Sequence, residues 1–110
     1  MRQKRIPVLQ GTLDMLILKA LGEDEFHGLA VVRRIEQISQ DAFHVTPGSL
    51  FPALHRMEKA GWLSSQWGES ANNRRAKYYR VTQSGKRQLN SETDQWKQTA
   101  HAIGYALRAI

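Results

Sequence analysis

The sequence predicts a mainly α-helical fold with one small β-hairpin. Three observations lead to this prediction. Apolar residues recur with the helical period in the N-terminal half, strand-like runs flank a polar loop between residues 62 and 82, and a helical pattern with a heptad-like stripe closes the chain. With 110 residues the chain has the size of one small domain. A domain of this size buries only a thin core, so packing against a second copy would increase its stability.

The composition is that of an ordinary globular protein. Hydrophobic residues make up 41% and charged residues 24% of the chain. Cysteine is absent, which excludes disulfides and thiolate chemistry and fits a reducing compartment, so we expect a cytoplasmic protein. Residues 1–22 have a basic start and an apolar run, but Asp14 and Lys19 interrupt the run and no small-residue cleavage site is evident. We therefore expect neither a signal peptide nor a membrane span.

The positive charge is concentrated in the middle of the chain. The net charge is +6 and the isoelectric point is about 10.1, which favours a polyanionic partner. Residues 1–43 are neutral overall, whereas residues 44–80 hold six Lys or Arg against two Glu. A second basic cluster, Arg2, Lys4 and Arg5, lies at the N-terminus. The alternative is a solvated basic surface with no partner.

Two helices are predicted before residue 41. The first is carried by apolar residues at 13, 16, 17, 20 and 21 and stops at Gly22. A loop at 23–25 follows. The second helix begins near His27 and Gly28. Its first N–H groups could hold a phosphate; the alternative is that His27 and Gly28 only form a turn. Its predicted inner stripe is Leu29, Val32, Ile35 and either Ile38 or Ser39.

A third helix is predicted around TPGSLFPALHRM at residues 46–57. Either Thr46 caps it with Pro47 in the first position, or Ser49 caps it and Pro52 falls in the first turn. In both cases it runs to about residue 60, and Leu50, Leu54 and Met57 form the buried stripe. The exposed face holds Ser49, Pro52, Arg56 and Lys59. Small residues first and basic residues later suit a helix that enters a DNA major groove; an ordinary surface helix is the alternative.

A basic hairpin is predicted next. Strand-like runs at 62–68 and 77–82 flank the loop ESANNRRA. Arg74, Arg75 and Lys77 would contact phosphates or lie in a minor groove. A basic hairpin directly after a pair of helices is the layout of a winged helix. The alternative is a charged hairpin that only keeps the chain soluble.

The order of short motifs resembles a known family. The chain reads LQGTLDMLILKAL at 9–21, HG at 27–28, VTPGSLFPALHRMEKAGWL at 45–63, WGE at 67–69 and NNRRAKYYRVT at 72–82. This pattern is similar to that of the PadR family of transcriptional regulators. The resemblance implies a bacterial winged helix-turn-helix repressor that binds DNA as a dimer. The family usually has tyrosine where this chain has Phe51, which cannot offer a hydroxyl to a phosphate. We expect Phe51 to pack or to touch a sugar, with slightly weaker binding and an unchanged fold.

The predicted domains are 1–82, which would bind DNA, and 83–110, a dimerisation helix capped by Thr82. A heptad-like seam runs along this helix through Leu89, Thr93, Trp96, Ala100, Ile103, Leu107 and Ile110. It could pack against a partner copy or dock on its own domain; in the PadR family the C-terminal helices make the dimer. Some PadR-like proteins bind flat aromatic compounds through an aromatic residue on this helix. Trp96 could serve in this way, with Gly104 leaving room beside it, or could be core.

An enzyme is not expected. The four histidines show no metal-ligand spacing, and no P-loop, dinucleotide turn or G-x-S-x-G turn is present, so no cofactor is predicted. The predicted function is a dimeric repressor on a near-palindromic operator, released by a small-molecule effector. Rival hypotheses are a winged helix for protein contacts and an RNA-binding module. The predicted DNA-binding residues are Thr46, Pro47, Ser49, Phe51, Pro52, His55, Arg56, Lys59, Asn73, Arg74, Arg75 and Lys77.

Overall fold

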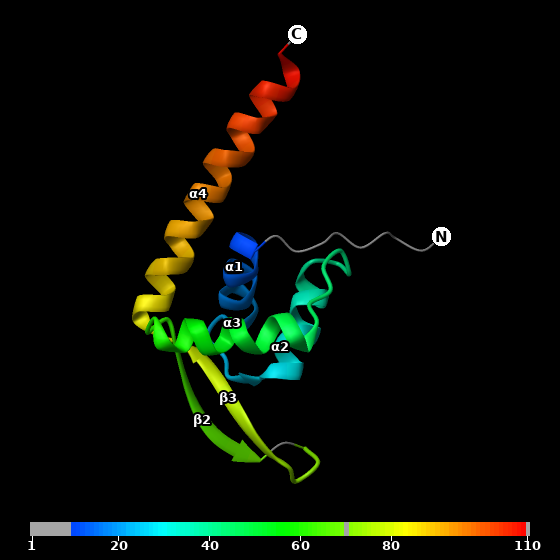
Figure 1. The fold of residues 1–110 in the computed structure, drawn as a ribbon, viewed down its shortest axis with the longest axis vertical. Helices are drawn as coiled ribbons and strands as arrows, with labels where there is room; N and C mark the ends of the chain where they lie inside the picture. Colours follow the sequence, from blue (N-terminus) through cyan, green and yellow to red (C-terminus); the bar gives the residue numbers. More distant parts are fainter. Residues whose placement is uncertain (1–9, 70, 110) are drawn as a thin grey trace, which may run out of the picture.

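The computed structural model describes residues 10–69 and 71–109, so the predictions made for Arg2, Lys4, Arg5 and Ile110 lie outside the described residues (Figure 1). The elements in chain order are α1 (Gln10–Leu21), β1 (Phe26–His27), α2 (Gly28–Ile38), α3 (Pro47–Lys59), β2 (Leu63–Glu69), β3 (Arg75–Val81) and α4 (Gln83–Arg108). Helix α3 crosses the middle of the molecule. The β2–β3 hairpin and α4 extend from it in opposite directions, which makes the longest dimension 59 Å.

The sheet has three antiparallel strands in the order β1-β3-β2. The predicted hairpin is confirmed, with Trp67 opposite Lys77 and Leu63 opposite Val81. Strand β1 was missed, because two residues are too few to show an alternating pattern. It pairs with the other edge of β3, placing Phe26 opposite Tyr79, and so anchors the hairpin to the start of α2.

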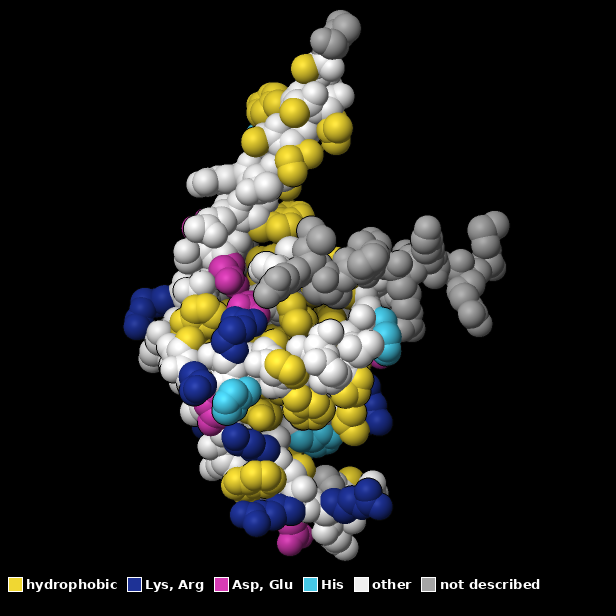
Figure 2. Space-filling view, in the orientation of Figure 1, with side chains coloured by type: hydrophobic (Ala, Val, Ile, Leu, Met, Phe, Trp, Pro, Cys, Tyr) yellow, Lys and Arg dark blue, Asp and Glu magenta, His cyan; other side chains and the backbone are white. Residues whose placement is uncertain are grey.

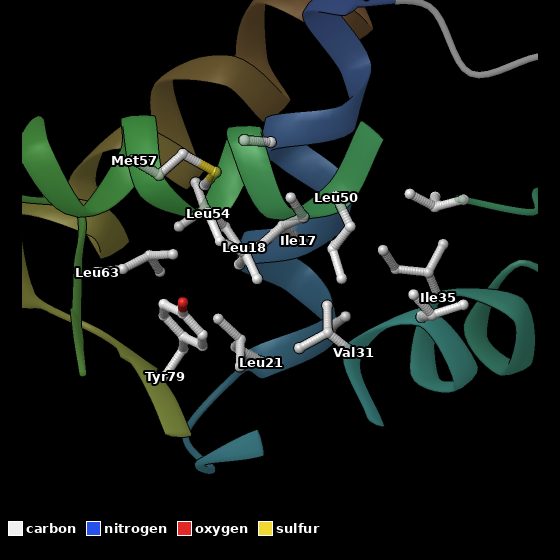
Figure 3. Close-up of a cluster of buried hydrophobic side chains, with 14 residues drawn as sticks. Ile17, Leu18, Leu21, Val31, Ile35, Leu50, Leu54, Met57, Leu63 and Tyr79 are labelled. Atoms are coloured by element: carbon white, nitrogen blue, oxygen red, sulfur yellow. The ribbon is translucent and has the colours of Figure 1, made fainter. Parts of the chain in front are cut away.

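The core lies where α1, α2 and α3 meet the base of the hairpin (Figure 3). Its fully buried side chains include Ile17, Leu18, Leu21, Val31, Ile35, Leu50, Leu54 and Met57. The predicted stripe of α2 was wrong in part: Val31 is buried, whereas Leu29 is 51% exposed and Ile38 is also exposed. Val31 and Ile35, one turn apart, set the phase of α2 against the core, and this phase turns Leu29 outward.

Helix α3 starts by the first of the two predicted routes. The Thr46 hydroxyl accepts a hydrogen bond from the Ser49 N–H at 3.3 Å, and Pro47 occupies the first helical position. Pro52 therefore lies inside the helix, where it removes one backbone hydrogen bond on the exposed side. Gly61, with a φ of 84°, follows the helix, as expected for a residue that must adopt the left-handed conformation.

Helix α4 begins at Gln83 under its predicted cap. The Thr82 hydroxyl accepts from the Gly85 N–H at 3.0 Å and donates to the Gly61 carbonyl at 2.6 Å. Gly85 is buried against the chain that enters β2, where an added Cβ would lie 2.1 Å from the Trp62 carbonyl oxygen. The first turns of α4 are thus fixed to the domain, and the remainder projects beyond it. Across residues 10–69 and 71–109, no helix combines the length and apolar character needed to cross a membrane.

Candidate nucleic-acid interface

The outward face of α3 is set by the residues opposite its buried side. Leu50, Ala53, Leu54 and Met57 face the core. The straight exposed stripe opposite them consists of Gly48, Pro52, His55 and Lys59, at steps of four, three and four. The predicted face shared Pro52 and Lys59 with this stripe. Two flanks border it: Arg56 lies toward α1, whereas on the other flank Phe51 lies against the start of α2 and Glu58 lies toward the hairpin.

Arg56 is held by an acid from α1 rather than standing free. Its guanidinium donates two hydrogen bonds to Asp14, at 2.6 and 2.8 Å. Asp14 is only 7% exposed, and the hydrogen bond to it is the main reason that the pKa of Arg56 is raised. Glu92 of α4 also acts on this pair, and burial raises the pKa of Glu92. Arg56 therefore fixes α3 to α1, and a DNA contact would have to share a guanidinium that is already engaged.

A second cluster ties α3 to the hairpin. Glu58 accepts a hydrogen bond from the Ser65 hydroxyl and forms an ion pair with Lys77 at 3.1 Å. The hydrogen bond from Ser65, followed by Lys77, lowers the pKa of Glu58, and the same contact raises the pKa of Lys77. His55 contributes to the lowered pKa of Glu58, which places it beside this junction. These contacts, made by Ser65 in β2 and Lys77 in β3, thus help to set the orientation of the hairpin relative to α3.

The outer part of the hairpin carries the arginines predicted to contact phosphates. Arg74 and Arg75 are exposed, and Asn73 adopts a left-handed φ of 57° in the turn. The guanidinium of Arg75 lies over the exposed Trp67 ring, 4.7 Å from its centroid. Trp67 was not among the residues predicted to bind DNA. In the structure it lies opposite Lys77 in the hairpin. In Figure 2 the dark-blue Lys and Arg side chains gather over the hairpin and the adjoining edge of α3.

The start of α2 lies beside the first turns of α3. His27 caps α2, since its Nδ1 accepts the Ala30 N–H at 3.3 Å, and its ring meets Tyr78 edge-on. Gly28 is buried against Phe51: an added Cβ would lie 2.6 Å from Cε1 of that ring. Phe51 itself is 45% exposed, so one side of its ring is packed and the other is open.

The apolar stripe of α4 is covered only at its beginning. Leu89 packs against the core, whereas Trp96, Ile103 and Leu107 are exposed, Leu107 to 81%. Figure 2 shows hydrophobic side chains along the projecting half of the helix. Packing of α4 on its own domain therefore covers Leu89, but it leaves the apolar residues further along α4 exposed. Within the described part of the chain, no group of three or more His, Asp or Glu is arranged to hold a metal ion.

Comparison with known proteins identifies the family. Residues 17–91, well over half of the chain, match the transcriptional regulator PadR-like family. The chain belongs to the PadR-like family. It is a transcriptional regulator with a winged helix-turn-helix fold, and PadR-like proteins act by binding DNA rather than as enzymes.

Individual relatives are similar to this protein along most of the chain. A PadR family regulator from Eggerthella lenta is 30% identical, with a TM-score of 0.79 over 92% of this chain and 86% of its own. A regulator from Clostridium thermocellum is 27% identical, with a TM-score of 0.79 over 87% of this chain and 93% of its own. Transcriptional regulator Rv3488 of Mycobacterium tuberculosis is 29% identical over 87 residues, which cover 79% of this chain and 78% of Rv3488.

Proposed function

We propose that the protein is a homodimeric repressor that places α3 of each copy in a DNA major groove and is released by a small-molecule effector. The observation that carries the DNA-binding geometry is the Glu58 junction. It joins the exposed stripe of α3 to the cationic hairpin, so both can meet one duplex. In this arrangement the helix contacts bases in the major groove, and the hairpin contacts the flanking phosphate backbone.

Within this proposal the DNA-facing residues divide by role. The N-terminal end of α3, with Pro47, Ser49, Phe51 and Pro52 and the Thr46 cap, approaches the base edges, because its small residues allow a close approach. His55 and Lys59 follow along the same stripe. The hairpin residues Asn73, Arg74 and Arg75 contact phosphates, whereas Arg56 and Lys77 chiefly orient α3 and the hairpin through their acidic partners.

The dimer is formed in this proposal by the projecting half of α4. Its exposed stripe of Trp96, Ala100, Ile103 and Leu107 repeats at steps of four, three and four, which suits packing against a second helix. A stripe of this length leaves apolar surface in water unless a partner covers it. Two copies joined in this way would present two α3 helices to a near-palindromic operator.

The effector is proposed to bind beside Trp96. The indole is exposed at the start of the uncovered stripe, and Gly104 two turns later leaves space along the helix. A flat aromatic compound held between two such indoles would change the distance between the two α3 helices and weaken operator binding.

The salt dependence of DNA binding tests the role of the hairpin. The operator is a duplex isolated by the wild-type protein from a randomised library, and its dissociation constant is measured over a series of salt concentrations. Replacing Arg74 and Arg75 by alanine removes up to four phosphate contacts from a dimer, so the log–log slope should become shallower by up to about 3.6. The control, Arg87→Ala with Lys97→Ala, removes the same charge from α4 and should leave the slope nearly unchanged. An equal change in both variants would remove the hairpin from the interface.

A further inference from the structure

The ring of Phe51 is the largest apolar group at the end of α3 that is proposed to enter the groove. Its neighbours on this exposed surface are Gly48, Ser49 and Pro52, all small or compact. Phe51 is 45% exposed although the core lies just beneath this turn of the helix. The ring therefore lies on the flank of α3 beside the start of α2, with part of its surface open next to the exposed stripe.

The ring is also held in place. Gly28 at the start of α2 leaves a space that the ring fills, because an added Cβ would lie 2.6 and 2.8 Å from Cε1 and Cζ. Leu29, the next residue of α2, is 51% exposed and apolar. One side of the ring is thus fixed by α2, and its open side needs no rearrangement before it makes a contact.

The chemistry of this surface excludes most groups of a DNA duplex. The Phe51 ring has no hydrogen-bond donor and no charge, so it cannot hold a phosphate. On the base edges of the major groove, the apolar group available to it is the 5-methyl group of thymine, since the other base-edge groups are hydrogen-bond donors or acceptors. We propose that Phe51 determines specificity by packing against a pyrimidine 5-methyl group, that of thymine or of 5-methylcytosine, in each half-site.

This inference rests on the proposed placement of α3 in the major groove and adds the chemistry of one base position. Burying a single methyl group changes a binding constant about fourfold. Two symmetric half-sites therefore give a loss on the order of 15-fold when both methyl groups are removed.

Thymine-to-deoxyuridine substitution tests the proposal because it removes the methyl group and leaves base pairing unchanged. The duplex selected from the randomised library is remade with each symmetric pair of thymines replaced in turn, and dissociation constants are measured at one salt concentration. For the wild-type protein, one pair should show the loss of about 15-fold. In Phe51→Ala the same replacement should have almost no further effect. At the same position, with guanine opposite, 5-methylcytosine should be bound more tightly than cytosine, because only 5-methylcytosine carries the methyl group.

Two further variants separate this contact from a loss of fold. Phe51→Leu keeps an apolar side chain and should keep part of the discrimination between thymine and deoxyuridine. His55→Ala, one turn further along α3 and on its exposed stripe, should weaken binding yet keep the full discrimination. Discrimination that is absent in the wild type, or unchanged in Phe51→Ala, would overturn the assignment of Phe51 alone. If the wild-type protein selects no sequence from the library, the proposed function itself is wrong.

Discussion

The ion pair between Arg56 and Asp14 should be a main determinant of stability, although Arg56 lies on the exposed half of α3. Replacing Arg56 by methionine keeps much of the side-chain volume but removes both hydrogen bonds to Asp14. The carboxylate then stays buried at 7% exposure without its partner. The free energy of unfolding should fall because a buried charge is left without compensation.

The size of the effect follows from the exposure of the two partners. Breaking a fully buried ion pair costs about 3–5 kcal/mol, and a hydrogen bond to a charged group contributes about 1.5–3 kcal/mol. The side chain of Arg56 is 52% exposed, so water reaches the site and the cost must be discounted. We therefore expect a loss of about 2 kcal/mol for Arg56→Met, and a smaller loss of about 1 kcal/mol for Asp14→Asn, which leaves no buried charge.

Urea unfolding at one protein concentration measures these losses, because the stability of a dimer depends on concentration. The double variant should lose less than Arg56→Met alone, about 1 kcal/mol, because it leaves no buried charge, which gives a coupling energy of about 2 kcal/mol. Arg33→Met, at an exposed position of α2, is the control and should change stability by less than about 0.5 kcal/mol. If Arg56→Met resembles this control, or if the two single losses simply add, the pair does not join α3 to α1.

Three more predictions concern α4 and its junction with the domain. Gly85→Ala should lower the free energy of unfolding by about 2–3 kcal/mol, because the added Cβ has no room. The control is Gly11→Ala, whose added Cβ meets nothing within 4 Å and should not destabilise the protein. Thermal melting compares the two variants. Burial raises the pKa of Glu92, so the carboxyl group binds a proton more tightly in the folded protein than in the unfolded chain, and its contribution to stability falls as the pH rises from the ordinary pKa of 4.5 through the raised folded pKa. Glu92→Gln should remove this fall and be the more stable protein near neutral pH in urea titrations. An identical pH profile of stability for both proteins would contradict this account. Ile103→Asp should shift sedimentation from dimer to monomer, whereas Gln98→Asp on the opposite side of α4 should not; a dimer that survives Ile103→Asp would exclude the proposed seam.

The elements whose ends are marked by local chemistry were predictable from the sequence. Thr82 caps α4 and Gly61 follows α3 as predicted, and Thr46 is one of the two caps, with Ser49, that the sequence allowed for α3. The hairpin was predictable because strand-forming runs flank a polar turn. These features depend on residues close together in the chain, so a single sequence contains the information.

The features that sequence missed depend on packing between distant segments. Strand β1 has only two residues and exists because β3 offers it an edge. The phase of α2 differs from the predicted stripe because Val31 rather than Leu29 meets the core. Likewise, the helical period alone could not show that Asp14, 42 residues earlier, engages Arg56. In each case the deciding partner lies in another element.

The engaged cations change how the positive charge of residues 44–80 should be interpreted. Two of its six basic residues, Arg56 and Lys77, are balanced by Asp14 and Glu58, so they orient elements more than they attract phosphate. Phosphate contacts also carry no sequence information directly. In the proposed placement of α3 in the major groove, discrimination between operators comes from groups on the outer surface of α3 that touch bases. This surface offers one large apolar ring, Phe51, among small and polar residues, which is why a methyl group is the base feature that we expect it to recognise.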